Sequence, residues 1–386
     1  MSQSVRNGGR GAIRVGFVVP VIVAALVVSG SSPTVAQRRT VPKKTAQGTR
    51  PQRQLGPAER PAGVTKEIET SIARGLAFLA ASQRADGAYG KSSWSSDTYP
   101  TAISSLAGLA FLASGSTPTR GPYAKNIERI TSYLLQKCLN NEYWAPGLIS
   151  NRSASEQRPM YSHAFAMTFL AQIFGQEKDA ARRERIRKVL QNAVKLTAGS
   201  QTEVGGWGYT PNSWEDEGTL VVTQMQGLRA CRDVGIKVDK RIIELGINFL
   251  KASTNPDGSV KYRASSSRYQ VRPGVTCAAV VALWNAGEYD SELIRRISRY
   301  MHANIDAQWG YGHHAEYVQY YLTQAKFVLG GKPWLSFYKQ ASELLMVEQD
   351  RSDGSWDGAD GGDLYGTSIA LLCLQMPYNR LPVYQR

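Results

Sequence analysis

Apolar residues recur at helical spacing along most of the chain after residue 65, and no stretch alternates between apolar and polar residues as a half-buried strand would. Two kinds of apolar segment take turns along the chain. One kind is amphipathic, whereas the other carries small and apolar residues on all sides, as a helix buried among other helices should. The pattern predicts an all-α chain in which outer and inner helices alternate.

The amphipathic segments predict six outer helices, at about 65–82, 124–139, 181–199, 239–253, 291–305 and 335–348. The apolar segments predict six inner helices, at about 101–113, 162–174, 219–234, 274–286, 315–329 and 366–376. A helix pair leaves one face uncovered, so neighbouring pairs must stack, and closing the stack into a ring removes its exposed ends. We therefore expect a single (α/α)6 toroid; the alternative is an open solenoid, but the last pair lacks a polar capping face.

A turn that contains Gly with Trp or Tyr recurs in every helix pair. The six turns follow one another at intervals of roughly 45 to 60 residues, the signature of a repeat architecture. They lie at residues 86–89, 142–147, 205–209, 257–260, 308–311 and 353–356.

Two of these turns complete a longer motif. Residues 74–89 read RGLAFLAASQRADGAY and residues 349–356 read QDRSDGSW, and degenerate copies occupy 201–207 and 246–258. These segments resemble the QW repeat of squalene and terpenoid cyclases and protein prenyltransferases, over about residues 65–380, with Tyr89 in the Trp position. The resemblance implies that superfamily's (α/α)6 toroid.

The residues of the repeat are interpreted as structural. A Gln at the end of an outer helix can bond free backbone groups, Gly permits the turn, and the aromatic ring packs on the adjacent helix end. This interpretation covers Gln83, Gly87, Tyr89, Trp207, Trp309, Gln349, Gly354 and Trp356.

Composition divides the chain into three parts. Arg6, Arg10 and Arg14 precede an uncharged run whose apolar centre, 18–28, is followed by small residues, which predicts a signal peptide over 1–36 in preference to an N-terminal anchor. Residues 37–61 are rich in Arg, Lys, Pro and Gln and predict a disordered basic linker, followed by the toroid over 62–386. An exported protein of the periplasm, cell envelope or extracellular space is expected.

The formal charge of +15 is concentrated before the toroid. Residues 1–60 contribute +9, which leaves +6 spread thinly over the remaining chain. Because that part shows no basic and aromatic cluster, a nucleic-acid partner is not expected. The linker is expected either to contact anionic envelope polymers or lipids or to remain a solvated tether.

The resemblance implies specific chemistry that this chain only partly carries. Prenyltransferases hold zinc partly through the His of an Asp-x-Tyr-His-Thr run, and the corresponding stretch, Asp363 to Thr367, has Gly366 in place of that ligand. The four cysteines are too scattered to form a metal site, so no metal is expected. The sequence also has no nucleotide-binding fingerprint, so no cofactor is expected.

Squalene-type cyclases use an acidic run at the head of an inner helix, and residues 215–219 resemble it loosely. The candidate catalytic carboxylates are Glu217, Asp216 and Asp363, although acids at this position also cap a helix N-terminus. Other polar side chains fall in or beside the loops before inner helices, which meet at one mouth of a toroid. These cleft-lining or binding candidates are Tyr99, Tyr161, His163, Arg272, His313, His314, Tyr317 and Tyr365.

Two functions remain open on this evidence. The first is non-catalytic binding of a polymer, lipid or partner protein in the central cleft. The alternative is an enzyme that acts on an isoprenoid or, with paired carboxylates or a Tyr and His pair, on a glycan. An isoprenoid enzyme needs a closed, aromatic-lined apolar cavity, whereas a polymer-binding protein should present an open, polar and shallow groove.

Overall fold

The computed structural model describes residues 60–90, 99–139, 146–151, 156–267, 270–306, 314–359 and 361–385. One compact unit begins at Ala58, and the expected signal peptide lies outside the described residues, as does nearly all of the expected linker. The described part contains twelve α-helices and no strand, which confirms the all-α prediction. No described helix has the length and apolar character needed to cross a membrane.

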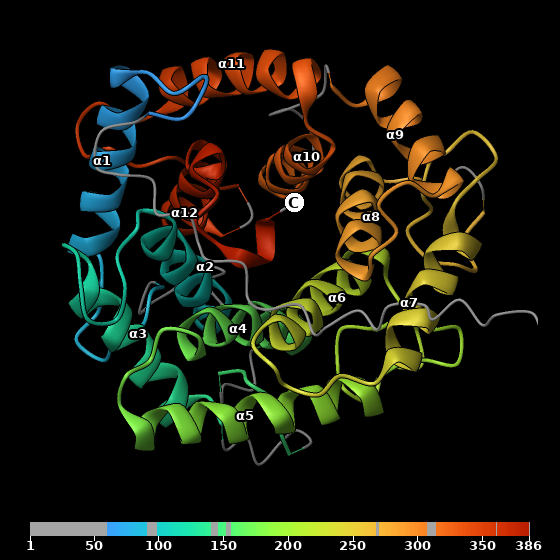
Figure 1. The fold of residues 1–386 in the computed structure, drawn as a ribbon, viewed down its shortest axis with the longest axis horizontal. Helices are drawn as coiled ribbons and strands as arrows, with labels where there is room; N and C mark the ends of the chain where they lie inside the picture. Colours follow the sequence, from blue (N-terminus) through green and yellow to red (C-terminus); the bar gives the residue numbers. More distant parts are fainter. Residues whose placement is uncertain are drawn as a thin grey trace, which may run out of the picture. The chain divides into compact units, whose positions relative to one another are not determined.

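The helices form two concentric rings (Figure 1). The outer ring consists of α1 (Lys66–Ala81), α3 (Ala124–Lys137), α5 (Ala180–Gly199), α7 (Lys240–Ser253), α9 (Glu292–Asn304) and α11 (Gly331–Glu348). The inner ring consists of α2 (Pro100–Ala113), α4 (Pro159–Phe174), α6 (Gly218–Asp233), α8 (Pro273–Ala286), α10 (Ala315–Leu329) and α12 (Gly362–Leu374). Each inner helix packs on the next, and α12 returns to α2 while α1 packs on α11 and α12. The ring is therefore closed, and the open-solenoid alternative was wrong.

Three helices begin earlier than the sequence predicted. The helix α4 begins at Pro159 rather than near residue 162, because Pro suits the first turn of a helix, where its missing N–H is not needed. The helices α11 and α12 begin at Gly331 and Gly362. Their first turns lack the apolar periodicity on which the prediction depended, and Asp363 consequently lies in the first turn of α12.

Glutamines at three turns join neighbouring helix pairs by the same two hydrogen bonds. Gln349 donates from Nε2 to the carbonyl of Gly354 in its own turn at 2.8 Å and to the carbonyl of Ser71 in α1 at 3.0 Å. This contact links the sixth pair to the first and so helps to close the ring. The other two follow the same pattern at 3.0–3.1 Å: Gln83 with Gly87 and Asn126, and Gln201 with Gly205 and Ile242.

The turn glycines lie against the backbone of the next outer helix. Gly205 has a φ of +91°, and a Cβ added there would lie 2.2 Å from the carbonyl oxygen of Leu245 in α7. Gly87 has a φ of +90° and would bring a Cβ within 2.3 Å of the carbonyl oxygen of Arg129 in α3. No other residue fits such positions, because both the left-handed backbone and the close approach exclude a side chain.

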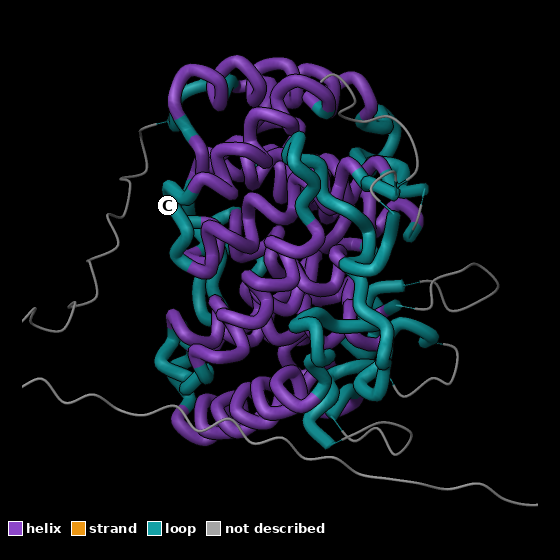
Figure 2. The backbone as a smooth tube through the Cα atoms, turned by 90° about the vertical axis from the view of Figure 1, so that its right-hand side faces the viewer, coloured by secondary structure: helices purple, strands orange, loops and turns teal. Residues whose placement is uncertain are grey.

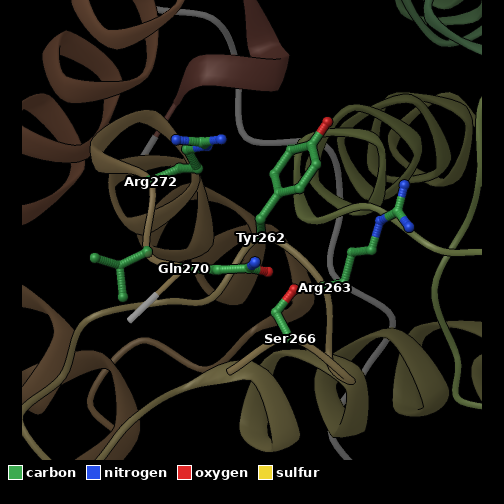
Figure 3. Close-up of a pocket in the computed structure, with 6 residues that line it drawn as sticks. Tyr262, Arg263, Ser266, Gln270 and Arg272 are labelled. Carbon is green, nitrogen blue, oxygen red and sulfur yellow. The ribbon is translucent and has the colours of Figure 1, made fainter. Parts of the chain in front are cut away.

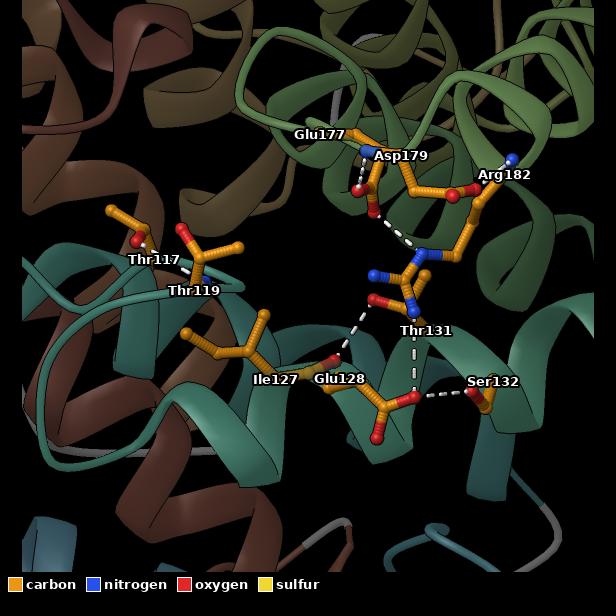
Figure 4. Close-up of polar contacts among 9 residues, drawn as sticks. All are labelled: Thr117, Thr119, Ile127, Glu128, Thr131, Ser132, Glu177, Asp179 and Arg182. Atoms are coloured by element: carbon orange, nitrogen blue, oxygen red, sulfur yellow. Dashed lines mark hydrogen bonds and ion pairs between the residues drawn. The ribbon is translucent and has the colours of Figure 1, made fainter.

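Polar contacts also join the outer helices (Figure 4). Arg182 in the first turn of α5 donates from Nε to the buried carboxylate of Glu177 at 2.6 Å and pairs with Glu128 of α3 at 3.4 Å. Asp179 caps the same helix by accepting from the backbone N–H of Arg182. These contacts fix the start of α5 against α3.

Side chains from facing helices meet at the centre of the ring. The helices α4 and α10 lie three steps apart in the inner ring, yet the rings of Phe165 and Tyr320 approach to 6.5 Å between centroids. Gln226 of α6 donates to the side-chain oxygen of Gln324 of α10 at 2.7 Å. These residues are buried, so the middle of the toroid is packed core.

The C-terminal segment enters the centre of the ring from the end at which the inner helices have their C-termini. It contains two short 3₁₀ helices, η2 (Met376–Tyr378) and η3 (Pro382–Tyr384), and η3 packs on α4 and α6. Tyr384 is buried, and its hydroxyl lies 2.5 Å from that of Tyr320. In the view down the ring the C-terminal segment lies within the outline of the helices (Figure 1), and Figure 2 shows the end of the chain at the face opposite to the one where most long loops gather.

Replacing the buried tail tyrosine should destabilise the whole toroid. Tyr384→Ala is expected to lower the free energy of unfolding by about 3–5 kcal/mol, because it removes a buried aromatic side chain and leaves a cavity. Tyr384→Phe, which keeps the ring but loses the hydrogen bond to Tyr320, should cost only about 1 kcal/mol. Denaturant unfolding of the three proteins tests this order; equal stability of Tyr384→Ala and the parent would contradict insertion of the tail.

Candidate functional site

The N-terminal ends of the inner helices and the loops before them lie at one end of the toroid, called the mouth below. Two of these loops are the loop 208–217, which precedes α6, and the loop 261–272, described except at residues 268 and 269, which precedes α8.

Glu217 joins these two loops. Its side chain is almost fully buried at 3% exposure, and one carboxylate oxygen accepts a hydrogen bond from the Tyr262 hydroxyl. The other oxygen pairs with Arg263 at 3.4 Å, and Arg263 also pairs with Glu215 at 2.8 Å. The backbone N–H of Gly218 donates to the Tyr262 carbonyl at 2.8 Å. Both oxygens of Glu217 are thus used to hold the loop 261–272 against the head of α6.

Tyrosine hydroxyls surround this link. The hydroxyls of Tyr209 and Tyr262 lie 2.6 Å apart, and that of Tyr161 lies 2.6 Å from the Thr219 hydroxyl. The Arg158 guanidinium stacks over the Tyr209 ring at 4.3 Å from its centroid. Burial raises the pKa of the Tyr161, Tyr209 and Tyr262 hydroxyls above the ordinary tyrosine value. At neutral pH these groups are therefore neutral hydrogen-bonding partners.

A shallow pocket of about 380 Å³ opens in the loop 261–272 (Figure 3). Arg272 and Arg263 lie on either side of Tyr262 in this view. Arg272 is exposed, its guanidinium lies 5.6 Å from the centroid of the Tyr262 ring, and it forms no ion pair with a described residue. The pocket is lined by Tyr262, Arg263, Ser266, Gln270, Val271 and Arg272.

Trp214 is the most exposed of the large hydrophobic residues in the loop 208–217, at 85%. It directly precedes Glu215, whose carboxylate pairs with Arg263, so it belongs to the same pair of loops as the pocket. Sequence analysis did not select it, because the tryptophans near the turns were interpreted as braces. Trp207 is such a residue, fully buried with its Nε1 donating to the Thr197 carbonyl at 2.7 Å. Position in the sequence distinguishes the two tryptophans: Trp207 lies within the turn, whereas Trp214 follows it in a polar stretch.

The three candidate acids do not come together. Asp216 is buried beneath the loop 261–272 and accepts from the backbone N–H of Ala264 at 3.4 Å, and burial raises the pKa of its carboxyl. Asp363 is exposed in the first turn of α12. Because α6 and α12 lie three steps apart in the inner ring, Glu217 and Asp363 begin helices on opposite sides of the mouth.

His163 lies in the core and not at the mouth. The backbone N–H of Ile149 donates to its Nδ1 at 3.1 Å, so the ring proton is on Nε2 and is donated to the Thr197 hydroxyl at 3.0 Å. Burial lowers the pKa of His163 to about 4. The sequence analysis grouped this residue with Tyr161 at the mouth. Because α4 is buried on nearly all sides, His163 instead faces α5, where it contacts Thr197.

The remaining candidates lie around the rim. Tyr99 precedes α2 and is half-buried, while Tyr317 and Tyr365 are half-buried in the first turns of α10 and α12. The Tyr317 hydroxyl donates to the Thr219 carbonyl at 3.3 Å. His314 is exposed, with a φ of 61° before α10. The candidates His313 and Trp309 lie outside the described residues.

A buried carboxyl that the sequence analysis did not select lies near the head of α4. Glu156 is 1% exposed and accepts a hydrogen bond from the Ser162 hydroxyl. Burial raises the pKa of this carboxyl to about 7. Within the described ranges, no group of three His, Cys, Asp or Glu side chains is arranged to hold a metal ion.

Comparison with known proteins finds similar structures only. No protein-family model matches the sequence, and no curated protein matches it. A GH76 α-mannanase from Bacteroides thetaiotaomicron matches with a TM-score of 0.59 and 11% identity, over 81% of this chain and 96% of the mannanase. An α-1,6-mannanase from a Salegentibacter species, in complex with α-1,6-mannotetrose, matches with a TM-score of 0.60 and 8% identity, over 81% and 98%.

A type II terpene cyclase from Scytonema, in complex with geranylgeranyl dihydroxybenzoate, matches with a TM-score of 0.52 and 13% identity, over 82% of this chain and 98% of the cyclase. These neighbours are (α/α)6 toroid proteins with different activities. At such identities the similarity establishes the fold, and function must be argued from the site. The chain is an (α/α)6 toroid protein.

Removing the charge of Glu217 should loosen the mouth. Glu217→Gln is expected to lower the free energy of unfolding by about 1.5–3 kcal/mol, because hydrogen bonds to a buried charged group are lost. The matched change Glu215→Gln breaks a pair whose acid is 40% exposed and should cost less than about 1 kcal/mol. Thermal and denaturant unfolding compare the two; a larger loss for Glu215→Gln would contradict the role of Glu217.

The stability of the protein should depend on Glu156 between pH 4.5 and 7. Its folded pKa is raised, so as pH rises through this window the unfolded chain releases a proton that the folded chain keeps, and stability falls. Relative to Glu156→Gln, the parent should lose about 3 kcal/mol between pH 4 and 8, from ~1.4 kcal/mol per pKa unit. His163, whose folded pKa is lowered, destabilises both proteins as pH falls from 6.5 toward 4 and cancels in the comparison.

Denaturant unfolding of both proteins across this pH range gives the measurement. Glu203→Gln, at an exposed position, serves as the control and should track the parent at every pH. Parallel curves for the parent and Glu156→Gln would contradict the prediction.

Proposed function

We propose that the protein binds a carbohydrate polymer at its mouth and does not cleave it. The observation that carries this proposal is an 85% exposed tryptophan, Trp214, on a loop joined to the pocket-bearing loop by the contacts of Arg263 with Glu215 and Glu217. A flat, exposed indole with hydrogen-bonding groups beside it is suited to stacking against an apolar face of a ligand.

The chemistry of the surface suits sugars. A pyranose ring has an apolar face of C–H groups and an edge of hydroxyls, so it needs a flat aromatic surface with hydrogen-bonding groups beside it. Trp214 offers such a surface, and Tyr262 and Arg272 lie on the adjoining loop. The link through Glu217 holds both loops in place, so little ordering would be required when a glycan binds.

The interior of the ring favours surface binding over an isoprenoid activity. The centre of the ring is filled by Phe165, Tyr320 and the inserted Tyr384, and the pocket lies in the loop 261–272 at the mouth. The mannanase in complex with α-1,6-mannotetrose shares the fold, which supports a carbohydrate ligand at the level of fold analogy.

The arrangement of acids favours binding without hydrolysis. Glycosidases hold two carboxyl groups about 5–9.5 Å apart across the scissile bond. Here both oxygens of Glu217 are engaged by Tyr262 and Arg263, and Asp363 begins the helix on the opposite side of the ring. We expect no release of reducing ends from any glycan that binds.

Removing the exposed indole should abolish most carbohydrate binding without affecting the fold. Trp214→Ala is expected to weaken binding about tenfold or more, a loss of about 1.4 kcal/mol, which is within the range for one aromatic contact. The matched control is Tyr289→Ala, at 52% exposure beside the end of α8, which should bind as the parent does. Affinity electrophoresis in gels containing soluble mannan, dextran or polygalacturonate measures the change.

The outcomes are distinct. Retarded migration of the parent and of Tyr289→Ala, with normal migration of Trp214→Ala, supports the proposal. Failure of the parent to bind any of the three polymers, or equal binding by Trp214→Ala, contradicts it. Reducing-end assays on the same mixtures would overturn the non-catalytic part if sugar were released.

A further inference from the structure

We propose that the pocket of the loop 261–272 binds the carboxylate of an acidic sugar, so that the polymer recognised at the mouth is an anionic glycan such as a polyuronate. The inference rests on the proposed carbohydrate-binding function and names the class of polymer.

Arg272 is the residue on which the inference depends. It is exposed, it forms no ion pair with a described residue, and the adjacent Tyr262 ring, 5.6 Å away, limits the directions in which it can lie. The guanidinium is planar and always charged, and it binds a carboxylate through two parallel hydrogen bonds. An uncompensated arginine at the edge of a pocket is therefore suited to a carboxylate ligand.

Arg263 differs from Arg272 because its charge is already compensated. Its two terminal nitrogens pair with Glu215 at 2.8 Å and Glu217 at 3.4 Å. This pairing holds the base of the loop 261–272. The single charge of Arg263 offsets one of the two carboxylates, and the carboxylate of Glu217 is buried at 3% exposure. Figure 3 shows Arg272 on the other side of Tyr262, so the uncompensated and compensated arginines are separated by the ring.

Further positive groups lie on or beside the same loops. Lys261 on the same loop donates to the carbonyl of Ala264 at 2.7 Å, so its charge has no acidic partner in that contact. Arg158 is exposed and lies over the ring of Tyr209, whose hydroxyl is hydrogen-bonded to that of Tyr262. The described acids at these loops are Glu215, Asp216 and Glu217, and only Glu215 has a partly exposed carboxylate. The four cations Arg158, Lys261, Arg263 and Arg272 exceed these three acids by one charge, which favours an anionic ligand.

The other lining groups suit the rest of a sugar ring. Gln270 is exposed and Ser266 is half-buried, and both bear neutral donors and acceptors for hydroxyl groups. The pocket of about 380 Å³ lies at the lower end of the range of ligand sites, roughly 300–1,000 Å³. This size fits one or two sugar units of a polymer whose neighbouring units would extend over the mouth.

The test compares trigalacturonate with its methyl ester, in which a methyl group replaces the negative charge of each carboxylate. The full chain, with its basic N-terminal part present in every variant, is titrated calorimetrically with each. We expect Arg272→Gln to bind trigalacturonate at least about tenfold more weakly than the parent, because a bidentate charged contact is lost, and to bind the ester as the parent does.

Arg183→Gln is the matched control. Arg183 is an exposed arginine of α5 on the outer ring, so this variant loses the same charge far from the loop 261–272 in sequence and on a different ring of helices. It should bind both ligands within about twofold of the parent, since an exposed charge beyond a Debye length of about 8 Å is largely screened in physiological salt.

Each other result has a defined meaning. If the parent binds the ester as tightly as the acid, or if Arg183→Gln weakens acid binding as much as Arg272→Gln, the inference is overturned while the proposed function stands. If the parent binds neither ligand and none of the neutral polymers, the carbohydrate-binding function itself fails. Comparison of melting temperatures shows whether each variant is folded.

Discussion

The close packing of the described turn glycines against the next outer helix is the constraint on which the toroid depends. At Gly205 the backbone of one pair lies so close to the carbonyl of Leu245 that a Cβ would approach it to 2.2 Å. The glutamine beside such a turn then bonds both its own turn and the neighbouring helix, as Gln201 does with Gly205 and Ile242. Each such contact joins one helix pair to the next, so its repetition sets the angle between pairs. Gln349 forms the corresponding contact with α1 and thereby closes the ring.

Closure of the ring also determines where function can be located. Twelve helices in two rings direct the heads of all inner helices to one end, and the loops before them share one surface. The other end is occupied by the C-terminal segment, whose Tyr384 reaches Tyr320 within the channel. The centre is therefore packed core, and the mouth is the surface at which we propose that a ligand binds.

The sequence predicted the fold well because the fold depends on local patterns. Amphipathic and fully apolar helices alternate, and glycine turns recur in every pair, so the (α/α)6 toroid followed from the residues alone. The starts of α11 and α12 were missed where glycine-rich segments hide the helical period. The insertion of the tail left no local signal, since the partner of Tyr384 lies 64 residues away.

The site was less predictable, because it depends on contacts between distant segments. The sequence selected Glu217 for its acidic run, but its partner Tyr262 lies 45 residues later, and that contact shows Glu217 to be a link between loops. His163 was selected for its position near the head of α4, yet a helix buried all round gives no indication of which side faces the mouth. Trp214 could only be recognised once its exposure was known.

Hydrogen–deuterium exchange of the full chain with and without trigalacturonate tests the central claim most directly, because it reports which backbone segments a ligand protects. The account predicts slower exchange in the loops 208–217 and 261–272 and unchanged exchange in the C-terminal segment 376–385. Protection of the C-terminal segment and the channel-facing turns of α4 and α10, with none in the two loops, would contradict a binding surface at the mouth.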